Sequence, residues 1–587
     1  MQTLGDLHAW STIYFFLSTT CIEFSNTPTM NVIRSHFMSI LRYRLSGGSL
    51  EPQGYGQFEM QIEMPRIDRL TQSLYSSGNR SGFPALFPAH PLHRVHPKEP
   101  SAGVVMGHLT ENSDSTPRDP TFEIDWEQND KENPTNWPLW YKCFTVWSVS
   151  LTTTCVILYT TSYTSGSPGI QESFGVTSRI VVLIGLTTYM IGLGLGCLVL
   201  APLSEVYGRR IIYISTSVLF TILVLPVALA PNFPAVVISR FFGGFFGSAS
   251  VVAGPGTIND IIQPKYRALA FSLWSLGAMN GPVLGPIIGG FVYQYLGWRW
   301  INWIVLICGG ASTACLCLVK ETYAPVLLKR RRKAKQIETG DTRWWTKYDS
   351  QAEESIWKRL QTSLSRPLIM AVFEPICLFW NVYVGVVYAV LFLCFVGYPI
   401  VFQQLREWSP GLAGLGYLGI GTGIALAVFS EPLVRNFLIA KHPPDPVTGK
   451  IPPEALVRPI CIGGILIPIG EFWFSWTARP PVHWISCVLA GVPFGLGNGL
   501  VFIYATSYLA ASYGMYAASA IAGNSVVRYV FGGVLPLAGS KMYRAMGVNW
   551  AGTMLALVEV FLTFIPFVFY RYGARIRQRS QMASKMI

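Results

Sequence analysis

Long apolar runs separated by short polar stretches dominate the chain from residue 141 onward. Each run is close to the roughly 20 residues that an α-helix needs to cross a bilayer. The pattern predicts an all-α, polytopic membrane protein with twelve spanning helices, arranged as two pseudo-symmetric bundles of six. The predicted spans are 141–161, 180–200, 211–230, 234–254, 268–293 and 301–319, then 372–402, 411–432, 459–478, 483–509, 516–540 and 548–570.

The first 138 residues follow a different pattern. From residue 24 they are rich in Ser, Pro, Gly, Arg and His and show no sustained periodicity, which is typical of disordered segments. We therefore predict five regions along the chain. They are a largely disordered cytoplasmic segment (1–138), a first six-helix bundle (139–320), a cytoplasmic central loop (321–368), a second six-helix bundle (369–571) and a cytoplasmic tail (572–587).

Composition supports a membrane protein. Of 587 residues, 51% are hydrophobic and only 13% are charged, whereas soluble proteins carry about 25% charged residues. The net charge of +13 is the kind of excess that membrane proteins collect on their cytoplasmic side, so no nucleic-acid partner is expected. The 11 cysteines form no CxxC pair and no zinc-like spacing with histidine, so no metal site is expected.

Basic residues in the short loops predict the orientation. If the first span starts inside, most of them fall in cytoplasmic loops, and both termini are cytoplasmic. The cytoplasmic set is Arg209, Arg210, Lys265, Arg267, the run 329–335, Arg435, Lys441, Lys450, Arg458 and the arginines of the tail. The opposite loops offer mainly Arg179, Arg299, Arg406, Arg479, Lys541 and Arg544.

Two halves of six spans favour a transporter with its substrate site between the halves, near the middle of the membrane. No G-x-x-x-x-G-K-[ST] sequence occurs, so no ATP cofactor is expected and the energy must come from a gradient. A membrane-embedded enzyme is the remote alternative. Six of the 8 histidines precede residue 109, and His442 and His483 are predicted on opposite faces, so no catalytic pair is expected.

The loop between spans 2 and 3 carries a family resemblance. Residues 200–210 read Leu-Ala-Pro-Leu-Ser-Glu-Val-Tyr-Gly-Arg-Arg, which resembles the signature loop of the major facilitator superfamily. Ala201 replaces the usual Gly, and Glu205 replaces the usual Asp. Gly208 permits the tight turn, while Arg209 and Arg210 meet anionic headgroups. Glu205 is expected to pair with a base or to cap a neighbouring helix.

Two further segments agree with this resemblance. Residues 240–244 in span 4 are similar to the buried-arginine motif of the superfamily, which makes Arg240 a functional candidate. Residues 281–290 in span 5 resemble the G-x-x-x-G-P-x-x-G-G motif of its antiporters. Pro286 is expected to kink the helix, and the glycine rows to allow close packing. The motif positions are Gly281, Gly285, Pro286, Gly289 and Gly290.

Other segments narrow the resemblance to fungal twelve-span drug:proton antiporters. They are residues 130–138, where Lys131 replaces the usual Pro, together with 320–325, 516–520 and 547–551. The group implies a monomeric, proton-coupled exporter of drugs, toxins or secondary metabolites in the plasma membrane, with the vacuolar membrane as the alternative. Polyamine exporters share these motifs, and a nutrient importer of the same superfamily remains a second alternative.

The acids inside the predicted spans are few. Relatives often carry an acid shortly before the span-11 motif, but residues 509–513 contain none, which weakens the polyamine alternative. Glu374 in span 7 is the predicted proton carrier, and Arg240, which cannot lose its proton, is predicted to assist it. A hydrated carboxylate at the membrane boundary is the alternative for Glu374. Glu471 and Glu559 are expected on peripheral spans.

Family architecture implies that spans 1, 4, 7 and 10 contribute most to the substrate cavity, with help from spans 2, 5, 8 and 11. Few acids and many aromatic rings there favour a neutral or weakly charged organic cargo. A helix-packing role is the alternative for each candidate. The predicted cavity residues are Trp380, Asn381, Tyr383, Phe494, Asn498, Asn524 and Arg528.

Overall fold

The computed structural model describes residues 119–127, 129–263, 266–349, 356–443, 451–580 and 582. All of them belong to one compact unit, Asn112–Ile587. Within this described part the secondary structure is helical, and the only extended pairing is a single bridge between Glu123 and Trp345. The disorder predicted for residues 1–118 lies outside the described residues.

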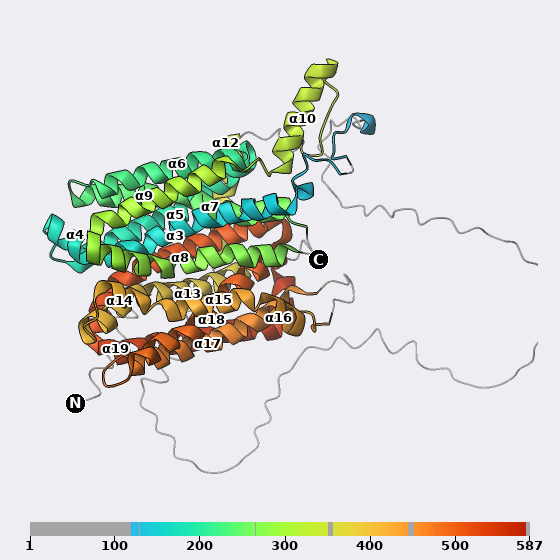
Figure 1. Cartoon of the computed structure of the whole chain (residues 1–587). Coiled ribbons are helices and arrows are strands. Elements are labelled where there is room, and N and C mark those ends of the chain that lie inside the picture. Colours follow the sequence, from blue (N-terminus) through green and yellow to red (C-terminus); the bar gives the residue numbers. More distant parts are fainter. Residues whose placement is uncertain are drawn as a thin grey trace, which may run out of the picture. The chain divides into compact units, whose positions relative to one another are not determined.

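Six long helices form the first half of the bundle (Figure 1). They are α3 (Leu139–Ser165), α5 (Arg179–Tyr207), α6 (Arg209–Ala228), α7 (Phe233–Ile261), α8 (Arg267–Leu296) and α9 (Trp298–Cys317), with the short α4 (Ser167–Phe174) between α3 and α5. Helix α3 packs against α8 and α9, α5 packs against α7, and α6 packs against α7 and α9.

The second half contains the other membrane-spanning helices, one of which is divided into the short α14 and the longer α15. They are α13 (Pro375–Pro399) with its π-helical extension η4 (Ile400–Leu405), α14 (Pro410–Leu415), α15 (Leu418–Phe429), α17 (Val457–Thr477), α18 (Trp484–Tyr513) and α19 (Ala517–Arg579). The short elements are α16 (Glu431–Val434), η5 (Arg435–Ile439), η6 (Pro453–Leu456) and η7 (Gly514–Tyr516). Helix α13 packs against α19, and α17 packs against α18 and α19.

Eleven helical segments of the described chain are long and apolar enough to cross a membrane. One of them, α19, is 63 residues long and contains Gly547, whose φ of 72° and ψ of 164° are not helical. This residue divides α19 into two parts that correspond to predicted spans 11 and 12. The all-α, polytopic membrane fold predicted from the apolar runs is therefore confirmed.

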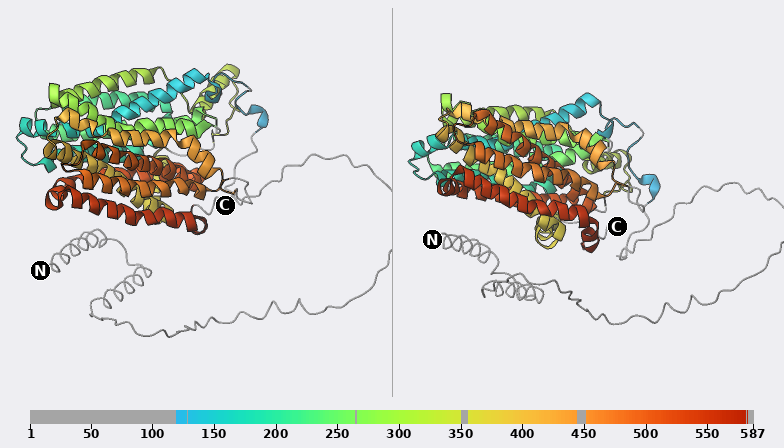
Figure 2. Two further views of the ribbon diagram at one scale, coloured as in Figure 1. Left: turned by 60° about the horizontal axis from the view of Figure 1, so that its bottom comes forward. Right: turned by 90° about the horizontal axis from the view of Figure 1, so that it is seen from below.

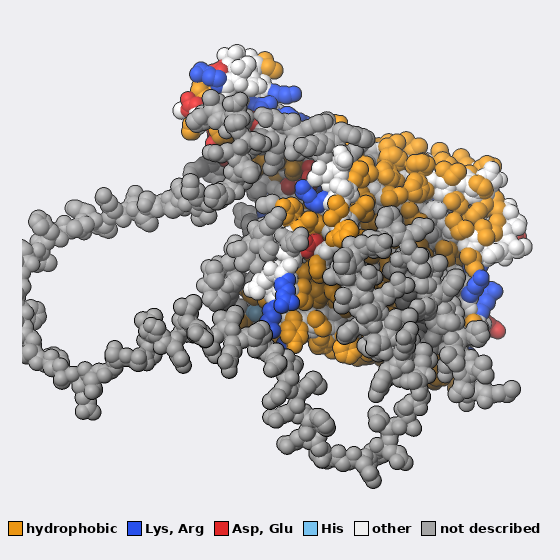
Figure 3. Space-filling model, turned by 180° about the vertical axis from the view of Figure 1, so that it is seen from behind, with side chains coloured by type: hydrophobic (Ala, Val, Ile, Leu, Met, Phe, Trp, Pro, Cys, Tyr) orange, Lys and Arg blue, Asp and Glu red, His pale blue; other side chains and the backbone are white. Residues whose placement is uncertain are grey.

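The two halves lie side by side, as Figures 1 and 2 show from three directions. Helix α5 of the first half packs against α19 of the second, and α8 packs against α14 and α15. The flanks of the bundle are covered by apolar side chains, and Lys and Arg side chains lie toward its ends (Figure 3). This distribution suits a bilayer, because the apolar band meets lipid tails and the basic groups meet headgroups.

Two helices connect the halves: α10 (Ala324–Thr339) and α12 (Ile356–Phe373). At the end of the segment 1–138, which is predicted to be largely disordered, the described residues include two short helices, η1 (Pro120–Phe122) and η2 (Pro134–Asn136). The N–H of Ile124 donates to the carbonyl of Trp345 at 2.9 Å, and Asp130 pairs with Arg331 of α10. The backbone N–H of Glu132 and the Arg331 guanidinium hold the pKa of Asp130 below its usual value. These contacts order a segment whose composition alone favours disorder.

Two names are used below for the ends of the bundle. The Gly208 end is the end at which α5 joins α6 through Gly208, and α10 projects from it (Figure 1). The Lys541 end is the opposite end, where α19 carries Lys541 shortly before its break at Gly547.

Candidate functional site

Gly208 makes the turn between α5 and α6 possible. Its φ of 101° and ψ of 154° lie in a region that essentially only glycine occupies. A Cβ at this position would also collide with a carboxylate oxygen of Glu321. The turn therefore depends on glycine for two separate reasons, one of backbone conformation and one of space.

Glu321, which follows α9, caps the start of α6. Its Oε1 accepts the N–H of Arg209 at 2.9 Å, and its Oε2 accepts the N–H of Arg210 at 3.1 Å. The first N–H groups of a helix have no partner within the helix, and an anion placed there is stabilised by the helix dipole. The Oε1 also accepts the N–H groups of Thr322 and Tyr323, each at 3.0 Å, just before α10. One buried carboxylate thus joins the starts of α6 and α10.

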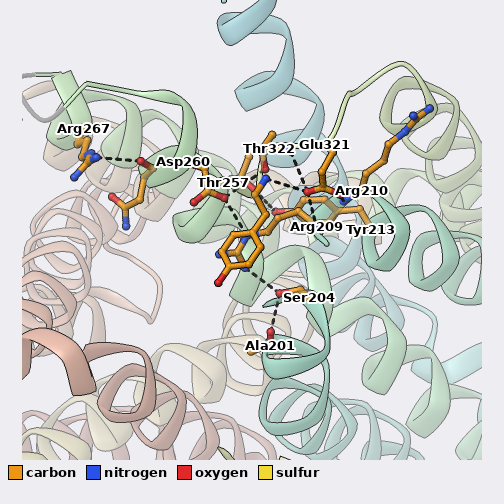
Figure 4. Close-up of polar contacts among 12 residues, drawn as sticks. Ala201, Ser204, Arg209, Arg210, Tyr213, Thr257, Asp260, Arg267, Glu321 and Thr322 are labelled. Carbon is orange, nitrogen blue, oxygen red and sulfur yellow. Dashed lines mark hydrogen bonds and ion pairs between the residues drawn. The ribbon is translucent and has the colours of Figure 1, made fainter. Parts of the chain in front are cut away.

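The side chain of Arg209 connects three helices at the same end. Its Nε pairs with Oδ2 of Asp260 on α7 at 3.2 Å, and its Nη1 donates to Oγ of Ser204 on α5 at 2.9 Å. The hydroxyl of Thr322 also approaches Asp260, at 3.4 Å. Figure 4 shows these groups converging where α5, α6, α7 and the segment after α9 meet. We call Ser204, Arg209, Asp260, Glu321 and Thr322 the Arg209 cluster.

The other two predicted loop residues lie at the edge of this cluster. Arg210 is exposed, and its Nη2 donates to the carbonyl of Cys317 at 3.2 Å. Glu205 is exposed on the last turn of α5, and Asp260 is the acid that forms the ion pair with Arg209. The sequence missed Asp260 and Glu321, although Glu321 lies in one of the segments that carried the family resemblance.

Arg240 lies completely buried on α7 between the rings of Tyr159, Tyr163 and Tyr189. Its guanidinium carbon is 4.1 Å from the centroid of Tyr163, which is within the range of a cation–π interaction. Its Nε donates to the carbonyl of Gly185 at 2.8 Å. Among the described residues no carboxylate pairs with Arg240, so it joins α3, α5 and α7 through rings and carbonyls.

The antiporter-like motif of α8 presents glycines in two directions. Gly281, Gly285 and Gly289 face α3. A Cβ added at Gly285 would collide with Thr161 of that helix, and one added at Gly281 or Gly289 would lie 3.0 Å from its nearest atom. Gly290 faces the start of α14 in the other half, and Pro286 lies within α8 at the wall of a cavity described below. The motif therefore allows α8 to pack closely on its own half and on the other half.

Glu374 occupies the position before α13, between α12 and α13, and is only 6% exposed. Its Oε2 accepts the hydroxyl of Tyr513 at 3.3 Å and the hydroxyl of Ser580. Its Oε1 accepts the N–H of Met582 at 3.2 Å. The carboxylate thus holds the C-terminal segment at the Gly208 end, and no contact brings it to Arg240.

Glu471 of α17 and Glu559 of α19 are buried inside the second half, with 4% and 1% of their surface exposed. Both carboxylate oxygens of Glu559 lack a hydrogen-bond partner among the described residues. An ionised carboxylate in such surroundings is costly, so these acids are further candidates for binding a proton.

Three of the predicted cavity residues lie together near the contact between the halves. Nδ2 of Asn524 on α19 donates to Oδ1 of Asn381 on α13 at 2.9 Å. Arg528, one turn further along α19, lies 5.0 Å and 4.7 Å from the ring centroids of Tyr388 and Phe502. All three polar side chains are buried.

The other four predicted cavity residues pack within the second half. Trp380 lies 5.4 Å from the ring of Phe569 and 6.0 Å from that of Tyr383. Phe494 packs against α17, and Nδ2 of Asn498 donates to its carbonyl at 2.9 Å. None of the seven predicted residues lines the cavity at the Lys541 end, so their role in binding substrate stays a prediction.

A cavity of about 500 Å³ opens between the two halves at the Lys541 end. Small-molecule sites commonly have about 300–1,000 Å³. Arg179 and Gln171 line it from the first half, and Gln403, Lys541 and Arg544 from the second. From the sequence, the three basic residues among these were recognised only as exceptions to the concentration of basic residues in the cytoplasmic loops.

Comparison with known proteins supplies independent information. A sequence model of the Major Facilitator Superfamily matches residues 149–536. The chain is 39% identical to a major facilitator superfamily multidrug transporter, mdrA, of Aspergillus fumigatus, over 80% of this chain and 77% of that protein. It is 36% identical to the ascochitine biosynthesis cluster MFS transporter of Didymella fabae, over 79% of this chain and 90% of that protein.

The fold has counterparts among solved structures. The xylose transporter XylE of E. coli, in a partially occluded inward-open conformation, superimposes with a TM-score of 0.52. The match covers 74% of this chain and 98% of that chain, at 16% sequence identity. At this identity the likeness concerns the arrangement of helices alone.

Proposed function

The chain belongs to the Major Facilitator Superfamily, and we propose that it is a secondary active transporter that exports small organic molecules. The observation that carries the proposal is a bundle of two helical halves with a cavity between them at one end. Relatives at 36–39% identity over about four fifths of the chain are named as a multidrug transporter and as a transporter of a biosynthesis cluster. A multi-pass membrane protein of this kind needs no cofactor for the proposed function.

The proposed direction, export, rests on the relatives named as a multidrug transporter and as a biosynthesis cluster transporter, and the orientation of the bundle is proposed from its basic residues. The Gly208 end carries Arg209, Arg210 and the basic run of α10, so we place it in the cytoplasm. The cavity at the Lys541 end then opens to the outside of the cell, where an exported molecule leaves. The plasma membrane is the proposed location, and the vacuolar membrane is the alternative.

Alternating access requires each half to move as one body against the other. The Arg209 cluster supports this requirement because it ties α5, α6, α7 and the start of α10 together at the cytoplasmic end. Gly290 of α8 lets this helix approach α14 of the other half closely, with no side chain of its own between them. We propose that the cluster keeps the first half rigid while the halves rock about the α5–α19 and α8–α14 contacts, and that the protein works as a monomer.

We propose that Glu374 binds the coupling proton. As a carboxylate it accepts hydrogen bonds from Tyr513, Ser580 and Met582. A protonated carboxyl has lost part of this accepting capacity, so proton binding would loosen the C-terminal segment at the start of α13. We propose that Arg240 stabilises the first half while the halves move. Glu471 and Glu559 are the alternative proton-binding groups.

Two alternatives predict different behaviour. An importer of the same superfamily would raise the cellular content of its substrate, whereas an exporter lowers it. A polyamine exporter needs acids to bind its polycation, and the described lining of the Lys541-end cavity contains none. The family is one of transporters, and we propose that the chain has no enzymatic activity.

Accumulation in intact cells tests the export function. Cells that express the chain are loaded with a fluorescent aromatic compound, and its content is measured with and without a protonophore. We expect expression to lower the content, and the protonophore to restore it to the level of cells lacking the protein. Higher content on expression would instead support an importer, and would contradict the proposal.

A further inference from the structure

We propose that the cavity at the Lys541 end is a binding site for organic anions, so that the cargo is a small carboxylic acid in its ionised form. This inference rests on the proposed export function and names its substrate class. It starts from an imbalance of charge: Arg179, Lys541 and Arg544 line the cavity, and its described lining contains no Asp or Glu.

The three cations of the cavity differ from Arg406 and Arg299, two other basic residues at the same end. Arg406 donates to the carbonyls of Thr477, Ala478 and Val482, and Arg299 donates to the carbonyl of Ala230. These two guanidinium groups hold loops together. In contrast, Arg179, Lys541 and Arg544 form no hydrogen bond or ion pair within the described part of the chain.

The buried Nε of Arg179 supports an anion-binding role for the cavity. Its Nε is shielded from solvent and has no hydrogen-bond partner among the described residues. A buried donor without an acceptor costs about 1–3 kcal/mol, and more when the group is charged. Arg544 lies near enough to Arg179 to repel it electrostatically. An anion between the two would remove both penalties, because it supplies an acceptor and neutralises the repulsion.

The cations come from both halves of the transporter. Arg179 begins α5 in the first half, whereas Lys541 and Arg544 lie on α19 in the second. An anion held among them would therefore contact both halves at once. A site between the halves can respond to their relative movement, as a substrate site in this architecture must.

The remainder of the wall suits an organic molecule better than a simple ion. Tyr417, Pro286 and Pro399 provide ring and apolar surface, and Gln171, Gln403 and Gln404 add neutral hydrogen-bonding groups. A volume of about 500 Å³ is far larger than an inorganic ion requires. We infer a carboxylate attached to an aromatic or similarly apolar body.

Two positive charges deeper in the bundle also favour an anionic cargo. Arg240 and Arg528 are buried among aromatic rings, and no described carboxylate forms an ion pair with either of them. Each of these two buried positions is therefore positively charged. A cationic cargo would meet repulsion at each of these positions.

An anionic lipid headgroup is the other source of the same chemistry. The cavity lies between the halves and has polar glutamines in its wall, which favours a water-soluble anion over a lipid. An experiment can distinguish a soluble organic anion from an anionic lipid headgroup, because the lipid composition of the bilayer can be chosen.

Binding of two matched probes tests the proposal without requiring transport. The purified full-length protein is placed in nanodiscs of phosphatidylcholine, and binding of 1-naphthoate and 1-naphthamide is measured at neutral pH. The two molecules share a ring system and differ in charge. We expect naphthoate to bind at least about tenfold more tightly, which corresponds to about 1.4 kcal/mol.

Three variants locate the site. Arg544→Gln and Lys541→Gln should each weaken naphthoate binding about threefold to tenfold and leave naphthamide binding unchanged. Arg479→Gln is the matched control, because Arg479 is an exposed arginine near the same end that does not line the cavity. It should change neither affinity.

The outcomes separate this inference from the export function. Equal binding of the two probes, or full naphthoate affinity in both cavity variants, would overturn the anion site even if the protein exports other compounds. Loss of naphthoate binding when phosphatidylglycerol is added to the nanodiscs would assign the cavity to lipid and also overturn it. If charge-dependent binding is found but no gradient drives transport, the anion site stands and the export function fails.

Discussion

Replacing Gly208 with alanine tests the arrangement of the Gly208 end, because the substitution has two separable costs. Alanine would have to adopt a φ of 101° and a ψ of 154°, which costs a non-glycine residue about 1–3 kcal/mol. Its Cβ would also displace the carboxylate of Glu321 from the first N–H groups of α6. Hydrogen bonds to charged groups contribute about 1.5–3 kcal/mol each, so losing two costs about 3–6 kcal/mol.

Gly297 provides a matched control. It precedes α9 as Gly208 precedes α6, with a φ of 83° and a ψ of 172°. No atom lies within 4 Å of the position that its Cβ would take. Gly297→Ala therefore carries the backbone cost of about 1–3 kcal/mol alone. The difference between the two variants isolates the collision with Glu321.

Thermal unfolding of the purified protein, followed with a thiol-reactive dye, measures both variants beside the wild type. We expect Gly208→Ala to lower the unfolding temperature clearly more than Gly297→Ala, and to reduce export in cells as well. Glu321→Gln, which keeps the shape but not the charge, should fall between the wild type and Gly208→Ala. Equal unfolding temperatures for the two glycine variants would refute the capping role assigned to Glu321.

Three further predictions concern other parts of the protein. Asp260→Asn should destabilise the protein by about 1–3 kcal/mol, because it leaves the partly buried Arg209 without its carboxylate partner. Adding Arg209→Gln to it should cost little more, and additive losses in thermal unfolding would show that the pair is not coupled. Glu374→Gln should release Ser580 and Met582, so a cysteine introduced as Met582→Cys should react with maleimide several-fold faster in permeabilised cells. An unchanged rate would show that Glu374 does not anchor these two residues. Lys333→Cys should resist an impermeant maleimide in intact cells, and labelling from outside would invert the proposed topology.

The sequence predicts the helices well because each span is a long apolar run bounded by polar residues. The predicted span 180–200 corresponds to α5 (Arg179–Tyr207), and the predicted span 459–478 corresponds to α17 (Val457–Thr477). The sequence does not predict which way the side chains of a span point. A membrane helix is apolar on its lipid side and on its packed side alike, so periodicity does not identify the inward face. Trp380, predicted in the substrate cavity, packs against Phe569 of the second half, and its role in binding substrate stays a prediction.

Contacts between segments that are distant in the sequence are the second feature that the sequence does not predict. Gly208 and Arg209 are recognisable from their local pattern, but Glu321 caps them from more than 100 positions further along the chain. Nothing near Asp260 in the sequence signals its pairing with Arg209. The tyrosines around Arg240 were in principle recognisable, because Tyr159 and Tyr163 are four residues apart and therefore share a face of α3. The cations of the cavity converge only once α5 and α19 are packed together.

Transport driven by a pH gradient tests the central claim, proton-coupled export, most directly. The purified protein is reconstituted into vesicles with its Gly208 end outward, and uptake of 1-naphthoate is followed after the lumen is made more acidic than the medium. Passive diffusion carries a weak acid toward the alkaline side, so accumulation in the acidic lumen requires the protein. We expect 1-naphthoate to accumulate in the lumen above its external concentration. A protonophore should abolish this accumulation, and so should Glu374→Gln if Glu374 binds the proton. Uptake that only equilibrates, with or without the gradient and for naphthamide as well, would contradict proton-coupled export.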